Sequence, residues 1–450
     1  MNREVFRKYD VRGIVEQDFD DGFIRDLGRS IGTYLAGQGG SRLAVGRDCR
    51  LSSDALRDLL VEGLQSTGAS VVDIGTVPTP LLYFAMHELE VDGGVMITGS
   101  HNPPEYNGFK IGVGKSTIYG PEIQKLADII EKGDYRQGQG SRSHKDIVPA
   151  YIDKVAAGFQ LSGRDISVAV DAGNGTGGVV AVPLLEKMGV KVKSLFCEMD
   201  GHFPNHHPDP TVPENLEDLI REVRGSQLPA GIAFDGDADR LGVVDDNGDI
   251  VWGDKLMILF SRQVLAQKPG ATIIGEVKCS KTMYDDITAH GGKAVMYKTG
   301  HSLIKARMKE TGAALAGEMS GHLFFADRYY GYDDAVYAAC RLVEILDNTG
   351  KKVSELLADV PKTVVTPEIR RDCPDDQKFD IVKKVTEHFR ARYDVNDVDG
   401  VRILYPDGWG LVRASNTQPV LVLRFEAETE ARLQEIQAEV EKVIREVGGL

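Results

Sequence analysis

One pattern occurs three times in the 450-residue chain and constrains its fold more than any other feature. It consists of an apolar strand, a polar loop, an amphipathic helix, a glycine and a second apolar strand, and its copies span residues 43–75, 167–196 and 271–300. Each copy has the order of a βαβ unit, in which buried strands form a sheet with helices on both faces. Because the copies are about a domain length apart, we expect three related mixed α/β domains rather than a solenoid. In the first copy, Ser52 or Ser53 stands where it can cap the helix.

The chain changes character from about residue 363. A helical segment near residues 376–392 precedes three short strand candidates, and the last 20 or so residues have a helical stripe of apolar side chains. Strands that cluster together between helices predict a smaller α+β domain. The expected domains are residues 1–147, 148–250, 251–362 and 363–450.

Composition excludes several classes of protein. A chain of 450 residues is too long for one core, which stops growing at about 250–300 residues. The net charge of −15 argues against nucleic-acid binding, although a small anionic substrate needs only a few local cations. Five scattered cysteines without a C-x-x-C pair indicate reduced thiols in a cytoplasmic protein. Because no apolar run suits a signal peptide or a membrane helix, we expect a soluble protein that does not bind membranes.

A serine stands in a polar loop within ITGSHNPPEYNGFKIG, residues 97–112. An apolar strand leads to Ser100, and two prolines prevent the loop from becoming helical. Asn107-Gly108 predicts a tight turn, after which a returning strand would bring Lys110 close to Ser100 and its neighbour His101. Positive charge and hydrogen-bond donors are what a nucleophilic or phosphorylated serine needs. A plain polar turn with a solvent-facing lysine is an equal alternative on this segment alone.

Three aspartates alternate with small residues in DGDADR, directly after an apolar strand. If the backbone is extended, Asp235, Asp237 and Asp239 point the same way and repel one another unless a cation lies among them. Carboxylate oxygens in this number suit Mg²⁺. A calcium loop of the EF-hand type would need glycine where Arg240 stands, and a hydrolase with an aspartate nucleophile fits the spacing only superficially. Metal binding is the favoured interpretation.

Two further polar segments suit a phosphorylated sugar. GEMSGH offers hydrogen-bonding groups for hydroxyls in Glu318, Ser320 and His322, although an ordinary polar turn is more common. A second loop, between two predicted strands, has the groups that a phosphate requires, in Arg413, Ser415, Asn416 and Thr417. Single residues at predicted loops are weaker candidates because most such residues are surface groups: Arg12, Arg47, Lys278 and His301.

The order of these segments along the chain is more specific than any one of them. Together they resemble the α-D-phosphohexomutase family, and most closely its phosphomannomutase/phosphoglucomutase members, through KYDVRG, TGSHNPPEYNGFK, DGDADR, GEMSGH and RASNTQP. The resemblance covers essentially the whole chain. It implies four domains around a central cleft, of which the first three share one α/β topology and the last is smaller.

The resemblance also implies a reaction. Ser100 would carry a phosphoryl group, and Asp235, Asp237 and Asp239 would hold Mg²⁺ together with a phosphoserine oxygen. Transfer to a hexose phosphate would give a bound hexose 1,6-bisphosphate, which turns around and returns its other phosphate to the serine. The net result is the interconversion of hexose 1-phosphate and hexose 6-phosphate, with mannose or glucose as the sugar. The expected protein is a monomer or a weak homo-oligomer.

The same resemblance implies roles for the remaining candidates. Groups for proton transfer and charge stabilisation would be Arg12, His101, Lys110 and His301, with Arg240 holding the phosphoserine loop. Sugar hydroxyls O3 and O4 would bind Glu318 and Ser320, with His322 nearby. The non-reacting phosphate would bind Arg413, Ser415, Asn416 and Thr417, assisted by Tyr9 and Lys278.

Three alternatives remain open. Phosphoglucosamine mutase is the closest one, and only Met319 within GEMSGH argues against it. A Mg²⁺-dependent phosphatase would use the same aspartates but release inorganic phosphate. A non-catalytic sugar-phosphate sensor is disfavoured because Ser100 and all three aspartates are present. For the mutase, we expect a hinge near residues 361–367 that lets the last domain close over the substrate.

Overall fold

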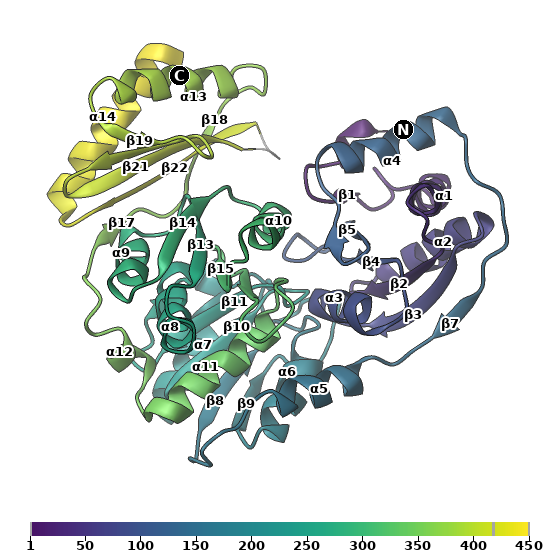
Figure 1. Ribbon diagram of the computed structural model, residues 1–450, viewed down its shortest axis with the longest axis horizontal. Coiled ribbons are helices and arrows are strands. Elements are labelled where there is room, and N and C mark those ends of the chain that lie inside the picture. The colour runs from purple at the N-terminus through teal and green to yellow at the C-terminus, as the bar shows by residue number, and fades with distance from the viewer. Residues whose placement is uncertain (1, 416–418, 449–450) are drawn as a thin grey trace.

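A computed structural model describes residues 2–415 and 419–448 and contains four β-sheets in succession along the chain (Figure 1). Helices pack against each sheet. We call the sheets with their helices the first unit (β1–β7), the second unit (β8–β12), the third unit (β13–β16) and the fourth unit (β17–β22). Three mixed α/β units followed by an α+β unit confirm the predicted fold class.

The first unit has a sheet of order β1-β5-β4-β2-β3-β7, with β6 paired to β5. Neither serine proposed as a cap of α2 hydrogen-bonds to the helix backbone, because the Ser53 hydroxyl donates to Asp48 instead, at 2.5 Å. The strands are β1 (Val11–Ile14), β2 (Arg42–Arg47), β3 (Ser70–Thr76), β4 (Gly93–Ile97), β5 (Tyr106–Val113), β6 (Ser116–Thr117) and β7 (Arg142–His144). The helices are α1 (Asp21–Gly37), α2 (Ser53–Ser66), α3 (Thr79–Glu88) and α4 (Pro121–Lys132), after a 3₁₀ turn at Arg3–Val5.

The second and third units have sheets of order β12-β11-β10-β8-β9 and β14-β13-β15-β16. The second contains β8 (Ser167–Asp171), β9 (Lys191–Leu195), β10 (Ala230–Phe234), β11 (Leu241–Asp245), β12 (Ile250–Val251), α5 (Val148–Ala157), α6 (Gly178–Lys187), a 3₁₀ turn at Pro213–Leu216 and α7 (Glu217–Ser226). The third contains β13 (Thr272–Glu276), β14 (Lys293–Tyr297), β15 (Leu315–Gly317), β16 (Leu323–Phe325), α8 (Gly253–Gln267), α9 (Lys281–Ala289), α10 (His301–Thr311), α11 (Ala335–Thr349) and α12 (Val353–Leu356).

The first three units share one strand topology, as the repeated sequence pattern predicts. In each, a central strand (β2, β8 or β13) has a parallel neighbour on both sides, and the last parallel strand is followed by an antiparallel one. The connections between these last two strands are β4–β5, β10–β11 and β15–β16. They carry the serine loop, the aspartate loop and GEMSGH respectively, so three candidate segments occupy equivalent places in three units.

The fourth unit has an antiparallel sheet of order β17-β22-β21-β20-β19, with β18 paired to β22. The helices α13 and α14 pack against the sheet (Figure 1). The bounds are β17 (Val364–Val365), β18 (Ile369–Asp372), α13 (Lys378–Arg390), β19 (Asp394–Asn396), β20 (Val401–Tyr405), β21 (Gly408–Ala414), β22 (Val420–Ala427) and α14 (Glu430–Gly448). The predicted helix, three strands and terminal helix correspond to α13, β20–β22 and α14, whereas β17, β18 and β19 were not predicted.

The buried apolar side chains are not divided evenly among the units. One large cluster takes side chains from all of the first three units, including Phe84, Tyr151, Phe234, Phe260 and Tyr337. The fourth unit has a core of its own between its sheet and its two helices. Among residues 2–415 and 419–448, the apolar cluster that joins the fourth unit to the third is small, and in it Val277 meets Trp409 and Leu411.

The five cysteines form no disulfide, and burial raises the pKa of every thiol, to about 12 at Cys49 and about 11 at Cys197. Within residues 2–415 and 419–448, no helix combines the length and the apolar character needed to span a bilayer.

Candidate active site

The serine loop and the aspartate loop meet between the first and second units. The hydroxyl of Ser100 donates a hydrogen bond to Asp235 Oδ2 at 2.7 Å and lies 3.0 Å from His101 Nδ1. Ser100 is buried and has a φ of +48°, a conformation that residues other than glycine rarely adopt. Burial and the nearby Arg240 and Arg12 guanidinium groups lower the pKa of His101, so its imidazole is neutral at pH 7.

The expected return of the chain after Ser100 occurs, but not at the predicted turn. Asn107 and Gly108 lie inside β5, and the chain reverses earlier, between β4 and β5. The Asn107 amide donates to the hydroxyls of Ser52 and Ser53, so it serves the packing of α2 rather than a tight turn. Lys110 still returns to the site, because β5 runs antiparallel to β4.

The three aspartates converge through a turn and not through an extended strand, which corrects the expected geometry. Ala238 has a φ of +52°, and its N–H donates to the carbonyl of Asp235. The N–H groups of Asp239 and Arg240 each donate to Asp235 Oδ1 at 3.1 Å. One oxygen from each carboxylate lies within 4.8 Å of the others, and all three side chains are fully buried.

Lys110 provides the positive charge closest to this cluster. Its ammonium donates to Asp237 Oδ2 at 2.8 Å and also to Asp239. Burial favours the neutral form of Asp237, but the charge and hydrogen bond of Lys110 and a 2.5 Å hydrogen bond from Thr79 lower its pKa. Burial and repulsion by the other two carboxylates raise the pKa of Asp235 well above its usual value. The cluster therefore holds more negative charge than Lys110 balances.

Two carboxylate oxygens in this cluster are open to a cation. Asp237 Oδ1 and Asp239 Oδ1 are buried and have no hydrogen-bond partner among the described residues. Buried charges of this kind are normally paired or bound to a metal. Three buried carboxylates with two free oxygens suit a hard divalent cation.

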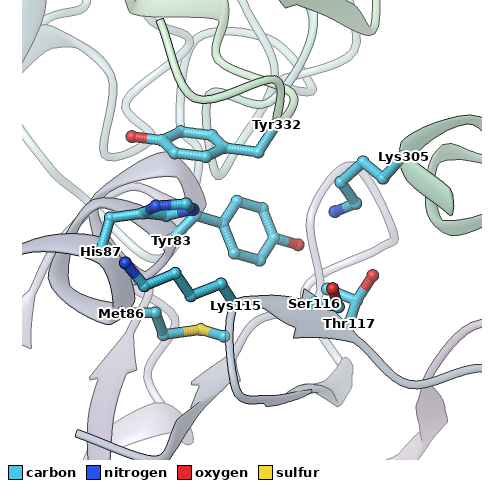
Figure 2. A pocket seen from close by; sticks show the side chains of 8 residues that line it. All are labelled: Tyr83, Met86, His87, Lys115, Ser116, Thr117, Lys305 and Tyr332. Atoms are coloured by element: carbon cyan, nitrogen blue, oxygen red, sulfur yellow. The ribbon is translucent and has the colours of Figure 1, made fainter. Parts of the chain in front are cut away.

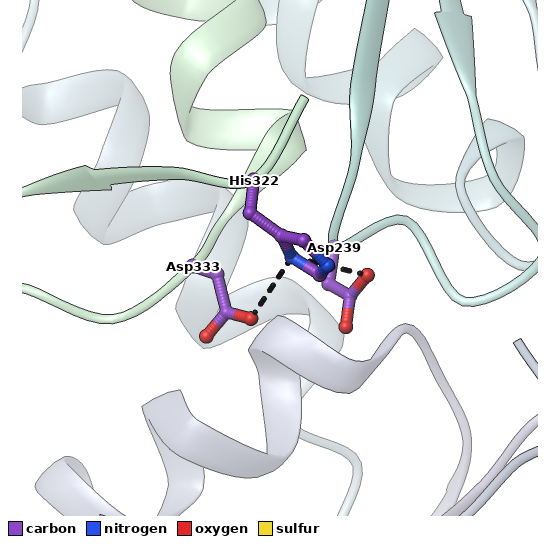
Figure 3. Close-up of side chains that lie close together, drawn as sticks. All are labelled: Asp239, His322 and Asp333. Atoms are coloured by element: carbon purple, nitrogen blue, oxygen red, sulfur yellow. Dashed lines mark ion pairs between the residues drawn. The ribbon is translucent and has the colours of Figure 1, made fainter. Parts of the chain in front are cut away.

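A buried aspartate that the sequence did not indicate, Asp333, lies next to His322 (Figure 3). Asp333 Oδ2 is 3.2 Å from His322 Nδ1 and 3.6 Å from His301 Nδ1, and Asp333 Oδ1 accepts from Lys305 at 2.9 Å. On the other side, His322 Nδ1 is 3.6 Å from Asp239, so the same imidazole faces two carboxylates. These three residues, Asp239, His322 and Asp333, form a second set that could hold a metal.

The neighbours of His322 determine which of its ring nitrogens carries the proton. Arg240 Nε donates to His322 Nε2 at 3.0 Å, so Nε2 is an acceptor and the proton is on Nδ1, between Asp333 and Asp239. Burial and the Lys305 ammonium lower the pKa of His301 well below its usual value, which keeps this ring neutral. The two rings lie 5.6 Å apart and nearly parallel.

The remaining candidates of the first and third units border this centre. Arg12 donates to the side chain of Asn102 at 2.8 Å and pairs with Asp10, which places it beside the serine loop. Glu318 accepts from the N–H of Gly300 at 2.6 Å and from the Ser320 hydroxyl at 3.2 Å. Tyr9, from the first unit, crosses to the third unit and donates to the carbonyl of Thr299.

The phosphate-loop candidates lie at the junction between the third and fourth units. Arg413 bonds to Asp399 at 3.1 Å, and Asp399 also accepts from the N–H of Thr299, the residue whose carbonyl binds Tyr9. Lys278 forms a 3.2 Å ion pair with Glu368 of the fourth unit. Ser415 is buried, whereas Asn416 and Thr417 lie outside the described residues.

A small cavity lies between α3 and Lys305, the residue that donates to Asp333 (Figure 2). It measures about 20 Å³ and is lined by Tyr83, Lys115, Thr117, Lys305 and Tyr332, among others. This volume admits a single water molecule, whereas ligand pockets measure about 300–1,000 Å³. The cavity is therefore not a sugar site, but Lys305 connects its wall to Asp333.

Comparison with known proteins assigns the family. The family models of the phosphoglucomutase/phosphomannomutase alpha/beta/alpha domains I, II and III match residues 3–137, 149–248 and 252–364. The model of the C-terminal domain of the same family matches residues 368–443. The chain belongs to the phosphoglucomutase/phosphomannomutase family.

Individual relatives match almost over their full length. A phosphomannomutase/phosphoglucomutase of Pseudomonas aeruginosa PAO1 is 48% identical over 434 residues, which are 96% of this chain and 94% of the relative. A phosphoglucomutase of Neisseria gonorrhoeae is 46% identical over 449 residues, covering 99% and 97% of the two chains. The crystal structure of a phosphoglucomutase/phosphomannomutase family protein from Burkholderia thailandensis superposes with a TM-score of 0.94 at 42% identity, covering 99% and 98% of the two chains.

Proposed function

We propose that the protein interconverts hexose 1-phosphate and hexose 6-phosphate, of mannose and glucose, through phosphorylated Ser100 and a bound hexose 1,6-bisphosphate. One observation carries this proposal: the Ser100 hydroxyl lies 2.7 Å from Asp235, in a buried cluster of three carboxylates to which Lys110 is bonded. A phosphoryl group on this oxygen would lie beside the carboxylate cluster bonded to Lys110, where a divalent cation would balance the combined negative charge, as transfer requires. The names of the full-length relatives support the same activity.

The metal of this proposal is Mg²⁺, held by Asp235, Asp237 and Asp239. The two unpartnered carboxylate oxygens and the raised pKa of Asp235 support a cation among the three groups. When bound, Mg²⁺ would neutralise charge on the transferring phosphoryl group. It would also be the partner of a phosphoserine oxygen.

The protein's own residues then position the sugar and move protons. Glu318 and Ser320 would bind the sugar hydroxyls O3 and O4, next to neutral His301. The non-reacting phosphate would bind at the junction of the third and fourth units, through Arg413, Ser415, Lys278 and Tyr9, together with Asn416 and Thr417. Proton transfer and charge stabilisation at the reacting oxygens would fall to Lys110, Arg12, His101 and His301, while Arg240 holds the serine loop and His322. Such positioning supplies most of the catalysis in phosphoryl transfer.

The choice of sugar follows from which hydroxyls are contacted. Glucose and mannose differ at C2, so contacts to O3 and O4 accept both. The same contacts do not exclude glucosamine 1-phosphate, which makes phosphoglucosamine mutase the alternative activity. We also propose domain limits of 1–147, 148–250, 251–362 and 363–450, a monomer or weak homo-oligomer, and closure of the last domain about a hinge at residues 361–367. Identical scattering profiles with and without bisphosphate would contradict a large closure.

A paired assay tests the activity. Glucose 1-phosphate, mannose 1-phosphate and glucosamine 1-phosphate are supplied separately with Mg²⁺ and trace glucose 1,6-bisphosphate, and both 6-phosphate and free phosphate are measured. We expect conversion of the first two without phosphate release. Preference for the third sugar would favour phosphoglucosamine mutase, and stoichiometric phosphate release would replace the mutase by a phosphatase.

Two substitutions test the assigned roles. Ser100→Ala should reduce kcat by a factor of about 10³ or more, since the phosphoryl carrier is lost. Asp237→Asn should sharply weaken Mg²⁺-dependent activity, because one charged oxygen of the cluster is removed. Steady-state rates across a Mg²⁺ titration measure both effects, with Ser66→Ala on α2 as a control serine. Full activity in either variant would refute the corresponding role.

A further inference from the structure

The loop that carries Ser100 is folded around the guanidinium group of Arg50. This arginine follows β2, and its side chain is fully buried. Its Nη1 donates to the carbonyl oxygens of Pro103 at 2.6 Å and Tyr106 at 3.0 Å. Its Nη2 donates to the carbonyl oxygens of Ser100 at 2.8 Å and of Asn102. Four carbonyls from one loop region thus accept from one side chain.

The loop has hydrogen bonds of its own, from the Ser100 N–H to the Thr98 hydroxyl at 2.8 Å and from the Asn102 N–H to the Gly99 carbonyl at 2.9 Å, and Arg50 supplies donors to four of its carbonyls. Its two prolines rule out helical hydrogen bonding, and buried carbonyl groups need donors. At Ser100 the positive φ is unfavourable for a residue with a Cβ atom, so the surroundings must enforce it. At Gly99 an added Cβ would lie 2.4 Å from Arg50 Nε, so the loop backbone fits directly against the guanidinium. Arg50 therefore binds the Ser100 backbone on its carbonyl side, while Thr98 binds it on its N–H side.

Arg50 is itself held from two sides. Asp48 Oδ2 lies 3.3 Å from Arg50 Nε and accepts from the N–H of Gly99 at 3.0 Å, so one carboxylate ties the arginine to the loop. Asp48 Oδ1 accepts from the Ser53 hydroxyl, which anchors the pair to α2. The ring of Phe203, from the second unit, lies 5.3 Å from the guanidinium carbon. Arg50 therefore contacts both of the units whose loops provide the hydrogen bond between Ser100 and Asp235.

We propose that Arg50, held by Asp48, is a positioning residue that fixes the backbone of Ser100 so that its oxygen faces the aspartate cluster during phosphoryl transfer. This inference rests on the proposed function. The guanidinium faces the loop carbonyls and not the Ser100 hydroxyl, so Arg50 acts through the geometry of the serine. Lysine cannot replace it, since an ammonium lacks the planar fork of donors that reaches four acceptors. A displacement of about 1 Å in such a group costs about 10²-fold in rate.

Arg50→Lys is the direct test, measured with glucose 1-phosphate, Mg²⁺ and trace glucose 1,6-bisphosphate. We expect kcat to fall about 10²-fold with KM changed less than about threefold. The rate is divided by the number of Ser100 sites that can be phosphorylated. That number is measured as the fraction of protein that carries phosphoserine in intact-protein mass spectrometry. Partial unfolding would lower the number of sites but leave the rate per site unchanged.

The matched control is Arg57→Lys. Arg57 is a largely buried arginine on α2 that pairs with Asp54, Asp58 and Asp73 and, among the described residues, makes no hydrogen bond or ion pair with the serine loop. It undergoes the same chemical change in the same unit, and we expect its rate per site to match the wild type. Asp48→Asn and Phe203→Leu perturb the support of Arg50 more gently, and each should lower kcat several-fold without raising KM. They keep the test valid if Arg50→Lys folds poorly.

The outcomes separate this inference from the proposed function. If the wild type is an active mutase and Ser100→Ala is inactive, a wild-type rate per site in Arg50→Lys overturns the positioning role alone. A loss confined to KM, or an equal loss in Arg57→Lys, overturns it as well. A wild type without mutase activity overturns the proposed function and the inference together.

Discussion

The first three units and the fourth differ in how their interiors are built. The first unit has a separate core on one face of its sheet, against α1, α2 and α4. On the other face, side chains from α3, α5, α6, α8 and α11 meet in one apolar core that the first three units share. The fourth unit instead encloses its own core between its sheet and α13 and α14. It lies at one side of the molecule, beyond the third unit (Figure 1).

The junction between these two parts is mainly polar. Arg402 of the fourth unit donates to the carbonyl oxygens of Val277 and Cys279, at 2.7 and 2.6 Å, while its guanidinium stacks 3.7 Å from the Trp409 ring. Arg424 donates to the carbonyl of Lys278. Water can replace hydrogen bonds of this kind, unlike an apolar core.

This difference corresponds to two demands of the proposed reaction. The serine, the aspartates and the histidines come from the first three units, where a common core fixes their relative positions. The proposed phosphate-binding residues Arg413 and Ser415 come from the fourth unit, whose movement would leave that core intact. Chemistry that depends on accurate positioning is thereby separated from a binding surface that has to admit and release substrate.

The largest expected effect on stability comes from removing a buried aromatic side chain from each core in turn. Phe260→Ala in the shared core and Phe389→Ala in the fourth core each remove a fully buried ring, at a cost of about 3–5 kcal/mol. We expect Phe260→Ala to lower the main calorimetric transition, and Phe389→Ala to unfold the fourth unit alone and expose it to limited proteolysis. A single shared transition in both variants would show that the two parts are not independent.

The second effect is on stability, and its pH dependence follows from a buried carboxyl group next to the shared core. Burial raises the pKa of Asp334 to about 6, despite hydrogen bonds from Tyr337 N–H and the hydroxyls of Tyr151 and Tyr329. Because the folded pKa exceeds the unfolded value of 3.8, folding is penalised as the pH rises from about 4 through 6, and the penalty then stays constant. Asp334→Asn should therefore be more stable than wild type at pH 8, by up to about 3 kcal/mol.

This gain should disappear near pH 4 and should affect only the transition of the first three units. Thermal unfolding at several pH values measures it. Asp347→Asn, near the other end of α11, is the control, since it weakens the hydrogen bonds that Asp347 accepts from Ser162 and should only destabilise. A constant difference between Asp334→Asn and wild type from pH 4 to 8 would contradict the raised pKa.

The smallest effect concerns binding at the fourth unit. Arg413→Ala should raise KM about 10- to 100-fold, since a hydrogen bond to a charged group contributes about 1.5–3 kcal/mol. The value of kcat should change little, because the reacting groups lie in the other units. Steady-state kinetics with glucose 1-phosphate measure both constants, with the surface residue Arg432, paired to Asp407, as an Ala control. A fall in kcat at unchanged KM would mean that the fourth unit takes part in the chemistry.

Local sequence patterns predicted the units, the returning strand with Lys110 and the meeting of three aspartates. They failed where a local signal was taken for a local structure: Asn107-Gly108 lies within a strand, and Asp235 to Asp239 form a turn. Thr79 and Asp333 gave no signal at all. Thr79 bonds to Asp237, 158 residues away, and such long-range contacts depend on how finished units pack together. Arg50 was missed for a related reason, since its acceptors are backbone atoms that no sequence motif records.

The raised pKa values of the five cysteine thiols have a practical consequence for following the two parts in solution. Maleimide dyes react with thiolates, and burial keeps all five native thiols protonated at neutral pH. Two new cysteines on exposed helix positions, such as Lys132→Cys on α4 and Lys442→Cys on α14, would therefore take up fluorophores selectively. Energy transfer between the two dyes would turn the relative position of the fourth unit into an optical signal, without removing a single native residue from the interior.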